Sequence, residues 1–342
     1  MIGAPYAATQ SAANTATTAT TEDAMNTIGL AKAIMKLGEV HPASPLKEIG
    51  TCQELFHHER FRRAADAERR AIMLASSQKK YAEELAYPWD HYFGIDLTPY
   101  LTGREVLDLG CFTGGRSVAW FERYRFKRLL GIDVAPEFIE AATQFAQSRG
   151  VDARFEVARG ETLTFASQSV DAIVSFDVFE HVQNLRQTLR ECQRVLRPGG
   201  RLLVVFPSYY QPGEHHLTLA TRIPGLKYLF SGTTLTRAYY EMLRERGSDA
   251  QWYWRAAPEL EAWEKGNTIN GTTYRGFGKL IREGGWKVVM NSRAPIGSIG
   301  RNVSRRLSYR LMSRLFAPLT VLPGLQEVFL HRVTYILEKP AN

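Results

Sequence analysis

The chain has 342 residues, 44% of them hydrophobic, and a formal net charge of +8. This length suffices for one large domain with insertions, and no apolar run approaches the roughly 20 residues needed to cross a bilayer. No charged segment precedes an apolar block at the amino terminus, so a secretory signal is not expected. Cys52, Cys111 and Cys192 are widely separated and have no metal-ligand spacing. A reducing cytoplasm is therefore the expected location, and no metal is predicted.

The first 87 residues differ in composition from the rest. Residues 1–22 are rich in Ala and Thr and almost uncharged, which predicts a disordered segment. Residues 23–87 are predicted to form a helical extension, because the sequence from about Glu54 to Leu85 is charged and alanine-rich. The aromatic segment 87–94 then leads into the core. It either closes over a ligand or only packs as a lead-in, and the sequence leaves both interpretations open.

Strands and helices alternate after this lead-in. Strands are predicted at about 104–109, 128–133, 152–157, 170–176 and 201–206, with helices near 115–124, 136–149 and 184–196. A helix at 274–283 and strands at 286–290 and 331–338 follow. Because parallel strands require crossovers of this kind, the alternation predicts an α/β fold with a doubly wound sheet.

A glycine-rich turn after the first predicted strand is the most informative segment. The strand leads into Asp108 and a turn that contains Gly110 and Gly114, and the next strand ends in Asp133. In a βαβ unit such a turn lets the backbone approach a nucleotide cofactor, and the second acid accepts hydrogen bonds from ribose hydroxyls. The dinucleotide pattern G-x-G-x-x-G is absent. A carboxylate beside the turn also disfavours a pyrophosphate and suits a cofactor with cationic groups, such as S-adenosylmethionine.

Two further segments extend this pattern. Residues 170–182 end in Glu180-His181-Val182, and residues 194–205 contain Arg197-Pro198-Gly199-Gly200 before an apolar run. Together with the turn, they resemble the class I S-adenosylmethionine-dependent methyltransferases, especially the branch that acts on small molecules, quinones and sugars. The resemblance covers roughly residues 88–210 and is weaker at 275–290 and 330–339.

The resemblance implies a Rossmann-like, doubly wound, mostly parallel seven-stranded sheet with helical insertions, over residues 88–342. It also implies an enzyme that uses S-adenosyl-L-methionine. The residues that it assigns to cofactor binding are Asp108, Gly110, Cys111, Phe112, Gly114, Asp133, Val134, Gly160, Glu161 and Asp177.

The chain departs from the family pattern at two positions. Phe112 stands where the family usually has glycine; cofactor binding is expected if the ring points away from the pocket, and an altered or inactive site if it points inward. Arg159 stands where relatives often carry an acid, so the adjacent Gly160 and Glu161 are expected to frame the adenine edge. Cys111 is interpreted as a small residue tolerated beside the ligand, rather than as a catalytic thiol.

An insertion at about 208–273 is predicted to bind the acceptor, because ligands lie beyond the carboxyl ends of the strands in open α/β sheets. Its aromatic rings either face a sugar or aromatic acceptor or form the insertion's own small core. Candidate bases for deprotonating a hydroxyl acceptor are His181, His215 and His216, since histidine commonly serves as a general base near neutral pH.

A second, basic insertion spans about 293–328. From Trp286 to the end the chain has nine Lys or Arg and two Glu, a net of +7. Starting at Arg293, this insertion holds Arg301, Arg305, Arg306, Arg310 and Arg314. Such a concentration of charge suggests an anionic neighbour: a lipid surface, a phosphate-bearing acceptor or nucleic acid. A solvated or partner-facing helix is an equally open interpretation.

These features predict an O-methyltransferase that acts on a hydroxylated small molecule or saccharide. The alternatives are N- or C-methylation of a lipid-linked or quinone-like acceptor, and a non-catalytic cofactor-binding or scaffold protein. Nucleic acid is not expected as a partner, because no RNA-binding module accompanies the core. A peripheral contact with an anionic membrane and the oligomeric state both stay open.

Overall fold

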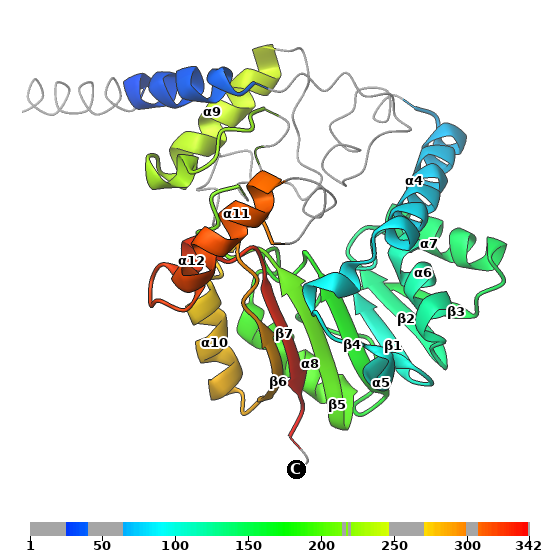
Figure 1. Cartoon of the computed structure of the whole chain (residues 1–342). Helices are drawn as coiled ribbons and strands as arrows, with labels where there is room; N and C mark the ends of the chain where they lie inside the picture. Colours follow the sequence, from blue (N-terminus) through cyan, green and yellow to red (C-terminus); the bar gives the residue numbers. More distant parts are fainter. Residues whose placement is uncertain are drawn as a thin grey trace, which may run out of the picture.

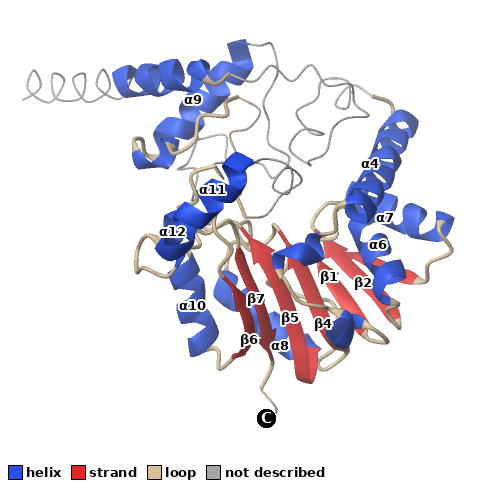
Figure 2. Cartoon of the chain, viewed as in Figure 1, coloured by secondary structure: helices blue, strands red, loops and turns tan. Residues whose placement is uncertain are grey.

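A single twisted sheet forms the centre of the protein (Figures 1 and 2). The computed structural model describes residues 25–39, 64–213, 217, 220–245, 270–298 and 307–340. The strands are β1 (Glu105–Leu109), β2 (Arg128–Asp133), β3 (Ala153–Val157), β4 (Val170–Phe176), β5 (Leu196–Phe206), β6 (Lys287–Ser292) and β7 (Val333–Glu338). They lie in the order β3-β2-β1-β4-β5-β7-β6, and β7 runs antiparallel to both of its neighbours. The predicted seven-stranded, mostly parallel α/β fold is confirmed.

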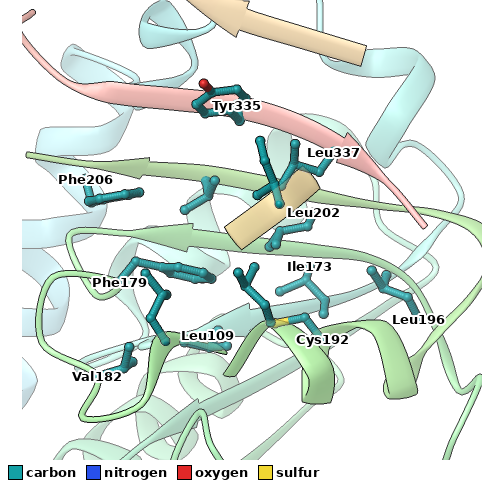
Figure 3. Close-up of a cluster of buried hydrophobic side chains, with 14 of the residues drawn as sticks. Leu109, Ile173, Phe179, Val182, Cys192, Leu196, Leu202, Phe206, Tyr335 and Leu337 are labelled. Carbon is teal, nitrogen blue, oxygen red and sulfur yellow. The ribbon is translucent and has the colours of Figure 1, made fainter. Parts of the chain in front are cut away.

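Helices cover both faces of the sheet, as the alternation of apolar residues along the strands requires. Leu107 and Leu109 of β1 pack in one cluster with residues of the helices α8 (Leu185–Val195) and α10 (Tyr274–Glu283). Figure 3 shows part of this cluster, with Cys192 of α8 against Ile173 and Leu202. Val106 points to the other face. There α5 (Thr98–Leu101), α6 (Gly115–Tyr124) and α7 (Pro136–Ser148) supply Leu101, Trp120 and Phe145.

The predicted element bounds are correct to within a few residues, except at β5. This strand begins at Leu196 instead of 201, and α8 ends at Val195. Pro198 has no backbone N–H and disfavours helical backbone at the residue before it. Leu196 therefore already pairs with Val170, and the register shifts between Val170 and Ala172.

The two described parts of the predicted N-terminal extension pack against different parts of the protein. Residues 25–37 form a helix whose buried side chains Ile28, Ala31 and Met35 pack against the insertion after β5, chiefly against α9 (Gly232–Glu245). An antiparallel bridge between Glu39 and Thr221 joins the same segments. By contrast, α4 (Asp66–Ala86) packs over α6 and α7 (Figure 1). Residues 1–22 and 54–63, for which disorder and helix were predicted, lie outside the described residues.

The contact of α4 with α6 is unusually close at Gly115. A Cβ atom on Gly115 would lie 2.1 Å from the carbonyl oxygen of Ser77 and 2.8 Å from the backbone nitrogen of Tyr81. Both of these atoms belong to the backbone of α4, which cannot yield as a side chain does. Only glycine lets the two helices approach this far.

Gly115→Ala is therefore expected to destabilise the protein by about 1–3 kcal/mol, because overpacking forces α4 away from α6. Chemical denaturation measures this change. Gly29→Ala is the matched control: Gly29 lies in the helix at 25–37 with no atom within 4 Å of an added Cβ. That substitution is expected to be neutral or to stabilise by up to about 1 kcal/mol, and equal behaviour of the two variants would contradict the close contact.

Candidate functional site

The site lies where the chain reverses its direction of winding across the sheet. From β1 the chain adds β2 and β3 on one side, and β4 and β5 on the other. The carboxyl ends of β1 and β4 therefore diverge into two loops, which is where α/β sheets bind ligands. A cavity of about 460 Å³ opens at this point, within the usual range for small-ligand sites.

Nearly all of the predicted site residues that the structure describes meet at this cavity. Its lining includes Asp108, Gly110, Cys111, Phe112, Asp133, Val134, Gly160, Glu161, Asp177 and His181. Gly114 is the described exception. It precedes α6 in a left-handed conformation (φ +74°), and a Cβ there would lie 2.7 Å from that of Ala142 in α7. Glycine at position 114 therefore permits close packing against α7 and does not form part of the cavity wall. His215 and His216 lie outside the described residues.

The turn after β1 has a left-handed backbone, which favours glycine, at Gly110 and Phe112 as well as at Gly114. Gly110 has φ +84°, and a Cβ on it would lie 2.2 Å from Cγ2 of Val178. Phe112 adopts φ +51°, a left-handed conformation that costs a non-glycine residue about 1–2 kcal/mol. Its backbone N–H donates to Oδ2 of Asp133 at 3.0 Å. Its ring packs edge to face on Phe138 of α7, with 4.5 Å between centroids.

Phe112 thus keeps the glycine-like backbone that the turn requires. The ring lines the cavity and leans on α7, and the cavity remains open beside it.

Two carboxylates lie at the carboxyl ends of the adjacent strands, Asp108 next to the last residue of β1 and Asp133 at the last residue of β2. Asp108 is buried and accepts a 2.6 Å hydrogen bond from the Ser117 hydroxyl. Asp133 is half-buried and accepts from the backbone N–H groups of Phe112 and Ala135. Burial raises the pKa of each to about 6, against the opposing effect of these hydrogen bonds. A ligand that brings hydroxyl donors or positive charge to this place would favour the ionised forms.

Two cationic side chains that the sequence did not predict also line the cavity, Lys80 of α4 and Arg116 of α6. The Arg116 guanidinium carbon lies 4.0 Å from the centroid of the Trp89 ring, and its Nε lies 3.4 Å from a Glu84 carboxylate oxygen. Burial lowers the pKa of Lys80. Arg116 directly follows the glycine turn and could have been found there, whereas no local signal marks Lys80.

The far wall is formed by the loop after β3. Oε1 of Glu161 accepts hydrogen bonds from the backbone N–H groups of Gln183 and Asn184, at 2.7 and 3.1 Å. Arg159 is exposed, with its Nε 3.8 Å from Oε2 of Glu161. Glu161 therefore links this loop to the segment that precedes α8, and it presents its second oxygen toward Arg159.

His181 lies at the rim of the cavity, after β4. Its backbone N–H donates to the Val178 carbonyl at 2.8 Å, which closes a tight turn. The ring is partly exposed, with Nε2 3.8 Å from Oε1 of the buried Glu180. On the same side, Nε of Arg332 lies 3.6 Å from Oδ1 of Asp177 and so joins the start of β7 to the end of β4.

The aromatic residues that the structure describes mostly have packing roles. Tyr239 and Tyr240 are buried in the small core formed by the helix at 25–37 and the insertion, which confirms the simpler of the two interpretations for these rings. In segment 87–94, Tyr92 and Phe93 are buried in the main core, and none of the eight residues lines the cavity. Trp252, Tyr253, Trp254 and Trp263 lie outside the described residues.

Cys111 is a buried free thiol in the cavity wall. Burial, together with the nearby Asp133 and Asp108, raises its pKa well above the ordinary thiol value. The group is therefore a neutral thiol near pH 7, which is consistent with its interpretation as a small residue beside the ligand.

Within the described part of the chain, no three His, Cys, Asp or Glu side chains lie together in a way that could hold a metal ion. No helix of this part is long and apolar enough to cross a membrane.

The central segment of the chain is similar to known methyltransferases. Residues 107–204 match a methyltransferase domain family. Over 111 residues the chain is 36% identical to an uncharacterised methyltransferase of Bacillus subtilis, covering 32% of this chain and 42% of the relative. Over 98 residues it is 38% identical to a malonyl-[acyl-carrier protein] O-methyltransferase of Coxiella burnetii, covering 29% and 32%. Over 110 residues it is 33% identical to a phosphoethanolamine N-methyltransferase of Triticum aestivum, covering 32% and 22%. The chain therefore spans less than half the length of each of these relatives.

Proposed function

We propose that this chain, a member of the class I S-adenosylmethionine-dependent methyltransferases, transfers a methyl group to a hydroxyl oxygen of a small molecule or saccharide. The observation that carries the proposal is the set of groups around one cavity: Asp108 and Asp133 on one wall and His181 on the rim. This combination offers acceptors for a cofactor's hydroxyls and cationic groups, together with a base close by.

The cavity fits S-adenosylmethionine in shape and charge. Gly110 leaves room for backbone approach, Asp133 ends β2 where a ribose would lie, and the Asp108 carboxylate provides negative charge near the turn. Lys80 and Arg116 would meet the carboxylate of the cofactor's amino acid part. Gly160 and Glu161 would border the adenine.

The protein's remaining tasks are to align the acceptor and remove its proton. When bound, S-adenosylmethionine supplies a methyl group already activated by the sulfonium. His181 would accept the hydroxyl proton, and the buried carboxylate of Glu180 would stabilise the resulting imidazolium. Val178 and Phe176 also line the cavity and would help to exclude water from the acceptor.

Two alternative functions differ from this proposal in their need for a base and in turnover. The first is N- or C-methylation of a lipid-linked or quinone-like acceptor. N-methylation needs no histidine base when the acceptor amine is already neutral. A non-catalytic protein would bind the cofactor, or a partner, without turnover; Phe112 in the turn is the feature that favours this alternative.

Methyl transfer to a panel of hydroxylated, amine and quinol acceptors, run beside calorimetry with S-adenosylhomocysteine, tests the proposal. We expect micromolar or tighter binding and turnover on a hydroxylated acceptor. Turnover on amines alone would favour the N-methylation alternative. Binding without turnover on any acceptor would favour the non-catalytic one, and absence of binding would contradict the cofactor assignment.

The affinity for S-adenosylhomocysteine is expected to depend on pH. With pKa values of about 6 in the ligand-free protein, Asp108 and Asp133 are largely protonated at pH 5 and ionised at pH 7.5. If binding requires the ionised forms, affinity rises by about tenfold per carboxylate over this interval and then levels off. Calorimetry from pH 5 to 8 measures this rise. Asp133→Asn should reduce its steepness, and an affinity independent of pH would contradict the role of both acids.

A further inference from the structure

Helix α11 (Leu307–Phe316) has none of its residues buried. Leu307, Leu311 and Leu315 recur at intervals of four and so share one side of the helix. They are 64%, 54% and 69% exposed. Three adjacent, exposed leucines on one helix of a folded chain form the kind of apolar patch that marks a contact surface.

Basic side chains flank this leucine stripe. Arg310 and Arg314 are both exposed, and each follows a leucine of the stripe by three residues, so they lie along its edge. No acidic residue occurs between Glu283 and Glu327, an interval that contains Lys287, Arg293, Arg301, Arg305, Arg306, Arg310 and Arg314. A partner that complements this surface would have both anionic and apolar groups.

A second apolar projection follows in the chain, beside a basic hollow. Val321, Leu322 and Leu325 are 54%, 46% and 41% exposed in the turn between η4 (Ala317–Thr320) and α12 (Gln326–Phe329). Gln326, the next residue, lines a hollow of about 530 Å³. The basic residues that line the same hollow are Arg275, Lys279, Arg282 and Arg293. In Figure 1, α11 and α12 lie together beyond the upper end of α10.

We propose that α11 and the turn 321–325 dock this protein on the surface of a membrane that contains anionic phospholipids. Leucines of the stripe enter the boundary between headgroups and acyl chains, and the flanking arginines bind phosphates. The hollow between α10 and α12 receives a further headgroup phosphate. Exposed leucine and arginine side chains alternate along one face of α11, and this favours a lipid surface over a soluble acidic partner. At the depth where leucines enter the acyl boundary of a membrane, the long arginine side chains still reach the phosphates of the headgroups.

This docking surface is distinct from the proposed catalytic site, since none of its residues lines the cavity between β1 and β4. Methyl transfer to a soluble acceptor is therefore expected to survive its disruption. Failure of the docking proposal and failure of the proposed function can be observed separately.

Co-sedimentation of the full chain with vesicles tests the proposal, using phosphatidylcholine alone and with phosphatidylglycerol added. We expect binding only to the mixed vesicles, reversed by high salt. Leu307→Ser, Leu311→Ser and Leu315→Ser combined should lower the partition coefficient at least tenfold. Arg310→Gln with Arg314→Gln should lower it about tenfold or more on mixed vesicles and flatten its salt dependence.

Matched controls are available elsewhere on the chain. Leu85→Ser replaces a leucine on α4 that is also 54% exposed. Arg104→Gln with Arg128→Gln removes the same charge from exposed positions at the amino ends of β1 and β2. Both controls should bind as the unmodified protein does. Equal binding to the two vesicle types, displacement from vesicles by millimolar inorganic phosphate, or unchanged binding of the leucine variant would each overturn the proposal.

Discussion

His181→Ala is expected to lower turnover about 10²- to 10⁴-fold, the range by which a general base accelerates proton transfer. His181 reaches the rim of the cavity from the turn after β4, close to the buried Glu180. Its loss should leave the cofactor wall intact, so affinity for S-adenosylhomocysteine should change little. The measurement is kcat on the best acceptor together with a binding titration of the same variant.

The pH profile separates a base from a residue that only shapes the pocket. Turnover of the unmodified protein should rise with pH through the range in which a histidine titrates, and the variant should lose this rise. Gln183→Ala is the matched control, because Gln183 lines the same rim and has no proton to exchange near neutral pH. If His181→Ala turns over normally, then His215, His216 or a mechanism without a base becomes the better explanation.

Local patterns in the sequence were sufficient to predict how the two strand-ending acids meet. Asp108 is near the end of β1 and Asp133 at the end of β2, and the strands pair in parallel, with Asp108 opposite Gly131. Strand pairing fixes which residues share the carboxyl edge of the sheet, so the convergence follows once the strands are recognised. The family resemblance adds the cofactor, which strand geometry alone does not specify.

Contacts between elements distant in the sequence could not be predicted in the same way. Lys80 reaches the cavity only because α4 packs closely over Gly115, a contact that no periodicity encodes. The helix at 25–37 buries its apolar side against the insertion after β5, about 190 residues away. An amphipathic pattern predicts that such a helix has a partner, but not which one.

Gly114 illustrates the same limit within a motif. The sequence groups it with Gly110 in one turn, and both adopt positive φ. Gly110 faces Val178 at the cavity, whereas Gly114 faces Ala142 of α7. A glycine in a motif indicates that something approaches closely or that the backbone is left-handed. Whether the approaching group is a ligand or a helix depends on the tertiary fold.

Asp133→Ala is expected to weaken binding of S-adenosylhomocysteine about ten- to a hundredfold, which corresponds to about 1.5–3 kcal/mol for hydrogen bonds to a charged acceptor. The carboxylate ends β2 on the cavity wall, where it would accept bonds from both ribose hydroxyls. It also accepts the Phe112 N–H, so the substitution releases the glycine turn as well. Calorimetric titration of the purified variant measures the loss.

These two effects of Asp133 can be separated by a graded series. Asp133→Asn keeps an oxygen acceptor for the Phe112 N–H but removes the charge, so it should preserve the turn and still weaken binding. Asp152→Ala removes an exposed aspartate just before β3 and should leave affinity unchanged. A binding loss in Asp133→Ala that Asp133→Asn does not share would assign Asp133 a role in holding the turn. An unchanged affinity in both variants would remove it from the cofactor site, since a charged hydrogen bond to the ribose cannot be lost without cost.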